Sequence, residues 1–144
     1  MFKIVSCYIP GDMEAALVGD TAYIDPSAKN TPYKYRRLCM HEKAHYETCP
    51  FDLVNAPRST REKYEHIADR SVAKAHMPVE RIVDLVLKGV DSLEEIAHSV
   101  RLDCEYICKM LKLYADIYGN DYRSGDYVVS FAPLAVAAVP ACET

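Results

Sequence analysis

The chain has 144 residues and a net charge of −4, and 50% of its residues are hydrophobic while 26% are charged. This length fits one domain with a real core, and the composition is ordinary for a soluble globular protein. The mild negative charge argues against a protein whose main task is to grip nucleic acid, and no apolar run approaches the ~18 residues of a membrane span. The opening residues, cut by Pro10, make a poor signal peptide, so we expect a cytoplasmic protein without membrane association.

The cysteines include no CxxC pair. Their even count permits disulfides, but without an export signal we expect reduced thiols and no cysteine-rich zinc site. The six positions are Cys7, Cys39, Cys49, Cys104, Cys108 and Cys142.

The first quarter of the chain favours β structure. Residues 2–8 are rich in β-favouring side chains. Two further apolar stretches, residues 15–18 and 22–25, flank Gly19-Asp20, which is a hairpin-turn signal. We therefore expect a small antiparallel sheet at the N-terminal end.

The middle of the chain has the apolar spacing of helices. Thr31 and Pro32 are residue types favoured at a helix start, and the pattern continues to about Thr48. Ser59 or Thr60 can cap the following helix. The remaining pattern predicts helices over 61–76, 79–88, 92–100 and 104–118, and then a strand over 127–131 that could return to the N-terminal sheet.

The pentapeptide His41-Glu42-Lys43-Ala44-His45 carries the strongest chemical signal in the sequence. Histidines one helical turn apart project from the same face, so both imidazoles can bind one cation. Glu42 lies beside them, where it can act as a general base toward a zinc-activated water. We interpret the motif as a zinc site; the alternative is a solvated helix that carries two histidines by chance.

A catalytic zinc ion needs a third protein ligand, and Glu65 is the carboxylate that the pattern favours. It shares one helical stripe with the small apolar residues Ala68, Val72 and Ala75. A carboxylate that faces inward is costly unless it is paired or metal-bound. We therefore predict that Glu65 completes the ligand set.

Two neighbours of Glu65 keep other assignments open. Asp69 follows one turn later, where it could accept a hydrogen bond that orients a ligating histidine, or serve as a ligand itself. His66 projects about a quarter-turn away and is the alternative third ligand. In the plainest interpretation, Glu65 is an exposed charge that pairs with Arg61 or Arg70.

The sequence resembles the ImmA/IrrE-type metallopeptidases, especially the short forms found in phages and mobile elements. The resemblance covers roughly residues 12–131, and HExxH followed by ExxAD and a Met-Pro helix end is more specific than HExxH alone. Two positions depart from the family pattern: Ala44 replaces the usual glycine, and Ser71 stands where a large aromatic residue is common. The resembling segments are HEKAHYET (41–48), YEHIADRSVAKAHMP (64–78) and SLEEIAHSVRLDCEYICKMLKLY (92–114).

The resemblance implies a gluzincin-like arrangement, with His41, His45 and Glu65 as zinc ligands and Glu42 as the general base. Family members cleave repressor-type DNA-binding proteins. We therefore predict a zinc-dependent endopeptidase that acts on a phage or mobile-element repressor in the cytoplasm of a bacterial host. The sequence does not identify a side chain that stabilises the oxyanion.

The predicted fold class is α+β: a small antiparallel N-terminal sheet, a helical bundle that carries HExxH, a helix-turn-helix-like pair and a final strand. We expect one metallopeptidase-like domain over residues 1–131, followed by a flexible tail over 132–144. Within the domain, residues 1–30 are mainly β, 31–90 hold the metal-site helices, 91–119 hold the helix pair and 127–131 form the strand.

The helix pair over residues 92–114 has the spacing of a DNA-binding motif. Its second helix begins with Asp103, Cys104 and Glu105, which would repel phosphate, so we do not expect nucleic acid as a partner. Two alternative functions stay open. One is a non-catalytic metal-binding regulator that acts by protein contact, and the less favoured one is a DNA-binding regulator that uses this helix pair.

Overall fold

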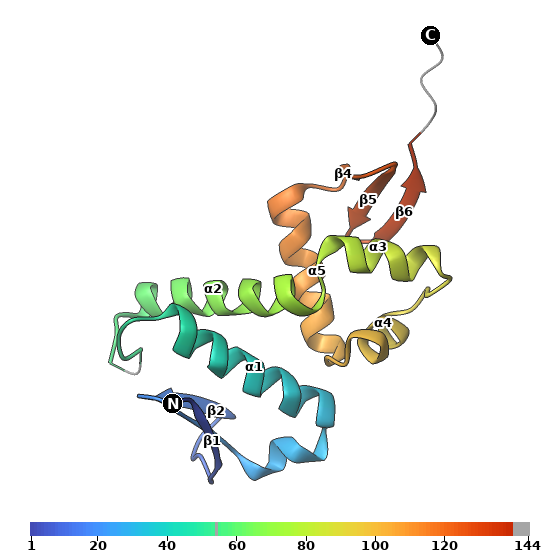
Figure 1. Ribbon diagram of the computed structural model, residues 1–144. Coiled ribbons are helices and arrows are strands. Elements are labelled where there is room, and N and C mark those ends of the chain that lie inside the picture. The colour runs from blue at the N-terminus through green and yellow to red at the C-terminus, as the bar shows by residue number, and fades with distance from the viewer. Residues whose placement is uncertain (54, 140–144) are drawn as a thin grey trace. The chain divides into compact units, whose positions relative to one another are not determined.

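The computed structural model describes residues 1–53 and 55–139, and the chain divides into two compact units, Met1–Ala75 and His76–Thr144. Figure 1 labels most of the elements of both. The sequence predicts one domain because no linker or change in composition marks the boundary, which falls within the last turn of a long helix. Each unit nevertheless contains buried apolar side chains of its own.

The first unit begins with a three-stranded sheet in the order β1-β3-β2. Its strands are β1 (Lys3–Ser6), β2 (Ala15–Val18) and β3 (Thr21–Ile24). The hairpin of β2 and β3 is antiparallel as expected, but β1 pairs with β3 in parallel, so the expectation of a wholly antiparallel sheet is wrong. β3 has the most buried side chains and takes the centre, so β1 pairs with β3 at the edge opposite to β2 and does not extend the hairpin.

A short 3-10 helix, η1 (Pro26–Asn30), joins the sheet to α1 (Pro32–Thr48). Asp25 caps η1 by accepting a hydrogen bond of 3.0 Å from the backbone amide of Ser27. Pro32 occupies the first turn of α1, as the sequence predicts. Leu38 on α1 packs with Ile24 and Ala28 in a buried cluster, so α1 is fixed across the sheet.

The helix α2 (Arg58–His76) begins three residues earlier than the sequence suggests. The carbonyl of Pro57 accepts a 2.9 Å hydrogen bond from the amide of Arg61, so Ser59 and Thr60 lie inside the first turn and the expected cap is wrong. On the predicted inward stripe, Ala68 and Val72 are buried, whereas Ala75 is exposed.

The second unit opens with three helices, α3 (Val79–Leu87), α4 (Leu93–Val100) and α5 (Cys104–Tyr118), close to their predicted bounds. Ser92 caps α4 with a 3.2 Å hydrogen bond from the amide of Glu95. The three residues that separate α4 from α5 match the expected helix-turn-helix-like pair. Among the described residues, no helix is both long and apolar enough to cross a membrane.

A second sheet of three antiparallel strands completes this unit, in the order β4-β5-β6. Its strands are β4 (Tyr122–Ser124), β5 (Tyr127–Phe131) and β6 (Leu134–Ala138). The predicted strand over 127–131 therefore forms, but it pairs with β4 and β6 and not with the N-terminal sheet. Phe131 is buried, and β5 packs on α5, which explains why this strand stays in its own unit.

The predicted flexible tail over 132–144 is wrong for its first half, because β6 pairs along its whole length with β5. Valine favours a strand but alanine does not, so β6 depends on its pairing with β5 more than on its own composition. Residues 140–144, including Cys142, lie outside the described part of the chain. The described cysteines are free thiols at Cys7, Cys39, Cys49, Cys104 and Cys108.

Candidate metal centre

The helix α1 presents His41 and His45 on the same face, one turn apart. Their rings meet edge to face, with centroids 4.5 Å apart and an interplanar angle of 88°. The side chain of His45 is only 4% exposed and that of His41 is 12% exposed. Both imidazoles are therefore held in fixed positions by packing, as a preformed ligand pair requires.

Glu65 on α2 reaches across to both histidines. Its two carboxylate oxygens lie 2.8 Å from Nε2 of His41 and 2.9 Å from Nε2 of His45. The apolar stripe explains the placement, since burial of Ala68 and Val72 turns this face of α2 toward α1. Its partners are thus imidazoles and not Arg61 or Arg70, while 54% of its side chain remains exposed.

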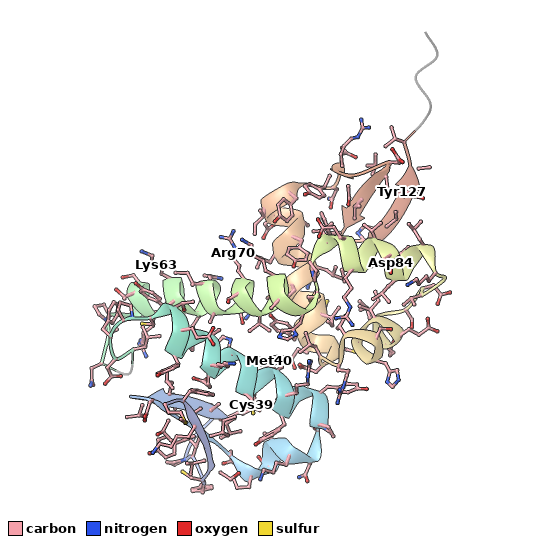
Figure 2. The ribbon with its side chains drawn as sticks, in the orientation of Figure 1. Cys39, Met40, Lys63, Arg70, Asp84 and Tyr127 are labelled. Carbon is pink, nitrogen blue, oxygen red and sulfur yellow. The ribbon has the colours of Figure 1, made fainter. Side chains whose placement is uncertain are left out.

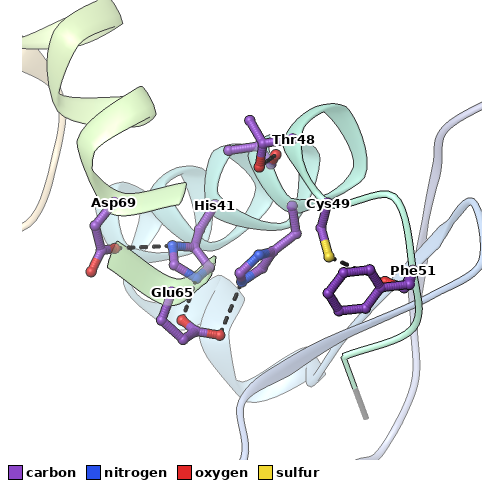
Figure 3. Close-up of polar contacts among 8 residues, drawn as sticks. His41, Thr48, Cys49, Phe51, Glu65 and Asp69 are labelled. Atoms are coloured by element: carbon purple, nitrogen blue, oxygen red, sulfur yellow. Dashed lines mark hydrogen bonds and ion pairs between the residues drawn. The ribbon is translucent and has the colours of Figure 1, made fainter. Parts of the chain in front are cut away.

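Asp69 contacts the other nitrogen of the His41 ring. Nδ1 of His41 lies 3.0 Å from Oδ1 of Asp69, which is buried on α2. Figure 3 shows the His41 ring between the carboxylates of Glu65 and Asp69. A proton held on Nδ1 by this contact leaves Nε2 as the nitrogen that can bind an ion.

The alternative third ligand, His66, is exposed on α2 and does not join the cluster. Neighbouring residues on a helix point about 100° apart, so the face that directs Glu65 toward the two histidines directs His66 away from them.

The charges of the cluster support one another. Burial alone would lower the pKa of His41, but the hydrogen bonds to Asp69 and Glu65 outweigh it and raise that pKa to about 9. Burial would likewise raise the pKa of Glu65, yet the hydrogen bonds from His41 and His45 hold it well below its usual range. In the absence of an ion, a proton on Nε2 of His41 therefore occupies the place that a cation would take.

Glu42 is buried beside the histidines, with only 6% of its surface exposed. Burial raises the pKa of its carboxyl group, while the nearby histidines oppose this shift. A carboxylate with a raised pKa accepts a proton more readily than an exposed one, which suits a general base.

The three side chains His41, His45 and Glu65 could hold a metal ion, because one ligand atom from each lies within 4.8 Å of the others. Two imidazole nitrogens and one carboxylate oxygen form a donor set that suits a divalent transition metal. Nδ1 of His45 is buried and has no hydrogen-bond partner among the described residues. Only Nε2 of His45 is thus available to an ion, and it already faces Glu65.

A groove with a volume of about 640 Å³ opens beside the cluster, which the sequence does not predict. Strand β2 forms one wall, the residues after α1 form a second, and the first two turns of α2 form a third. Glu42, His45 and Glu65 lie in its lining, so the groove gives direct access to the candidate metal position.

The outer edge of β2 faces no neighbouring strand in the sheet. The amide of Asp25 donates to the carbonyl of Glu14, so the antiparallel pattern directs the backbone groups of Ala16 and Val18 toward β3. The amides and carbonyls of Ala15 and Leu17 therefore point outward. Both residues line the groove.

The fold and the site define an α+β protein with a possible His-His-Glu metal centre beside an open groove. Comparisons with models of known families, with curated proteins and with solved structures found no match to this chain. The functional interpretation therefore rests on the geometry of the site and on the sequence motifs that produce it.

Proposed function

We propose that the protein is a zinc-dependent endopeptidase. The observation that carries the proposal is the convergence of His41, His45 and Glu65 on one point, with the buried Glu42 beside them. Two histidines, a third ligand from another helix and a carboxylate outside the ligand set together match what peptide hydrolysis by a zinc site requires.

Zinc is the ion that the donor set favours. His41, His45 and Glu65 would hold it through two imidazole nitrogens and one carboxylate, the three-ligand set typical of catalytic zinc sites. When bound, zinc supplies Lewis-acid chemistry, since it lowers the pKa of water toward neutrality and polarises a peptide carbonyl.

The remaining chemistry belongs to the side chains. Glu42 takes the proton from the attacking water and delivers it to the amine nitrogen as the peptide C–N bond breaks, so that the amine leaves in neutral form. The aspartate Asp69 holds the ring of His41 so that Nε2 faces the ligand position.

The substrate would lie along β2 as an extended strand. The outward backbone groups of Ala15 and Leu17 are two residues apart, a spacing of about 7 Å. An extended peptide that pairs antiparallel with β2 presents its own amides and carbonyls at the same spacing. Main-chain hydrogen bonds of this kind hold any extended peptide. They would place its backbone in the groove that Glu42, His45 and Glu65 line.

Resemblance of the segments around His41 and Glu65 to ImmA/IrrE-type peptidases supports a repressor-type transcription regulator as the protein substrate. On this proposal the protein comes from a phage or another mobile element and acts in the cytoplasm of its bacterial host. Unit 2, with its acidic start of α5, would serve protein contact and not DNA binding.

The test is cleavage of a complex peptide mixture by purified, zinc-loaded protein. A tryptic digest of a bacterial proteome, analysed by mass spectrometry, should show new termini with the wild type and none with Glu42→Gln. The matched control is Glu47→Gln, an exposed glutamate on the same helix, which should cleave as the wild type does.

Zinc measured in the same preparations makes the result decisive. If Glu42→Gln retains zinc but loses cleavage, the endopeptidase proposal holds. Zinc-loaded wild type that yields no new termini would contradict it and would favour a metal-binding regulator that acts by contact.

A further inference from the structure

The groove beside the candidate metal centre contains an arginine whose charge has no partner among the residues that the structure describes. Arg61 lies near the start of α2, in the part of the helix that forms one wall of the groove. Glu65, one helical turn further on, lines the groove as well. Among the described residues, Arg61 forms no ion pair or side-chain hydrogen bond, and its side chain is exposed. Its guanidinium is therefore available to a ligand in the groove.

The other charges that α2 contributes to this lining are already engaged. Nε of Arg58 lies 2.8 Å from a carboxylate oxygen of Glu62. Glu65 is held by both histidines through its two oxygens. In the described structure, Arg61 is thus the positively charged residue of this α2 wall that has no ion-pair partner. The two glutamates within one turn of it, Glu62 and Glu65, contact other residues.

Apolar side chains form much of the remaining surface of the groove. Met13 and Leu17 come from the β2 side, and Phe51 and Leu53 come from the segment after α1. Met13 and Phe51 are strongly exposed for their size, at 57% and 47%. A peptide in the groove would cover this apolar surface, and a charged group that enters with it would be partly shielded from water.

We propose that Arg61 selects substrates by binding a peptide carboxylate, in the first place the side chain of an aspartate or glutamate near the scissile bond. The proposal rests on the proposed function of the groove as the substrate site. Arginine presents a fork of N–H donors that matches both oxygens of a carboxylate, so it discriminates against amides and against cations. Arg61 is then a specificity-determining residue, separate from the groups that perform hydrolysis.

The experiment measures peptide binding apart from turnover. Zinc-loaded Glu42→Gln protein is incubated with a library of randomised decapeptides with amidated C-termini, and the retained peptides are sequenced. Asp and Glu should be enriched at one position by about fivefold, the ratio expected for a partly exposed ion pair. A second library with free C-termini shows whether a terminal carboxylate can take the same place.

Variants at Arg61 test whether this residue binds the acidic side chain of the peptide. In the same background, Arg61→Ala should remove the enrichment, and Arg61→Glu should replace it with enrichment of Lys and Arg. The matched control is Lys63→Ala, because Lys63 lies on α2 but about 200° around the helix and outside the groove lining (Figure 2). This control should leave the enrichment unchanged.

The outcomes separate the two proposals. Acidic enrichment that depends on Arg61, with no cleavage by the wild type, would support the binding role and contradict the endopeptidase. Cleavage without acidic preference, or a preference that survives Arg61→Ala, would overturn the role of Arg61 and leave the endopeptidase intact. Absence of both binding and cleavage would overturn both.

Discussion

Asp69 accepts a hydrogen bond from Nδ1 of His41 across 3.0 Å, so a buried carboxylate on α2 determines which nitrogen of an α1 imidazole is left for an ion. The carboxylate also opposes the effect of burial on the His41 ring, which would otherwise favour its neutral form. The same contact therefore governs both the orientation and the protonation of His41.

We expect Asp69→Ala to weaken zinc binding by about 10- to 100-fold, the range typical of a group that orients a metal-ligating histidine. Asp69→Asn should cause a smaller loss, because an amide oxygen can still accept from Nδ1 but carries no charge. Competition with a fluorescent zinc chelator measures both. Equal affinity in wild type and Asp69→Ala would contradict the positioning role.

Substitutions of Glu65 and His66 by alanine test which of these residues is the third zinc ligand. Glu65→Ala should purify with little or no zinc, because only two ligands are left and each imidazole loses its carboxylate partner. His66→Ala should retain the zinc content of the wild type, since His66 is exposed and outside the cluster. Elemental analysis by mass spectrometry decides between them. The reverse result would make His66 the ligand.

The local parts of this structure are predictable from sequence. The pattern gives the helices to within a few residues, because apolar spacing and capping residues act within a single segment. The same locality underlies the preference for Glu65 over His66, because a stripe through Ala68 and Val72 is a property of one helix.

The non-local parts are not predictable in the same way. Whether β1 pairs in parallel with β3 depends on which edges meet in the folded chain, and no single segment contains that information. The groove forms only when β2 folds against the segments after α1 and at the start of α2, so motif analysis does not place Arg61 in its wall. In the sequence RSTREKYEH, nothing distinguishes Arg61 from an ordinary charged residue on the surface.

Tyr114 provides a test of the second unit. Its hydroxyl donates a 3.0 Å hydrogen bond to the carbonyl of Met77 in a buried position. Tyr114→Phe should therefore lower the free energy of unfolding by about 1–2 kcal/mol at pH 7, whereas Tyr118→Phe, in the neighbouring and more exposed ring, should change it little. Urea denaturation followed by circular dichroism measures both. An unchanged midpoint for Tyr114→Phe would contradict the importance of this bond.

Alkaline pH tests the same tyrosine independently. Burial raises the pKa of Tyr114 from 10.0 to about 12. In this range the unfolded chain loses the phenolic proton before the folded one does, so the stability that the neutral hydroxyl contributes falls as pH rises from 10 to 12. The difference in stability between wild type and Tyr114→Phe should shrink over this interval. A constant difference would contradict the raised pKa.

Zinc binding to the metal-free protein should release a proton from His41. With carboxylates on both ring nitrogens, the pKa of His41 is about 9, so below that pH the ring is protonated and an ion must displace the proton on Nε2. Affinity should therefore rise as pH increases toward 9. At pH 8 this ring should contribute about one proton per ion in the wild type, and clearly less in Asp69→Asn, whose His41 lacks one of the two carboxylates.

Calorimetry in two buffers of different ionisation enthalpy gives the number of protons directly. Protons that zinc removes from solvent are common to both proteins, so the difference between wild type and Asp69→Asn reports on His41 alone. Lys43→Ala, an exposed cation on α1 that contacts Glu47, is the control for general charge effects. Equal proton release in wild type and Asp69→Asn would show that Asp69 does not hold His41 in its protonated form.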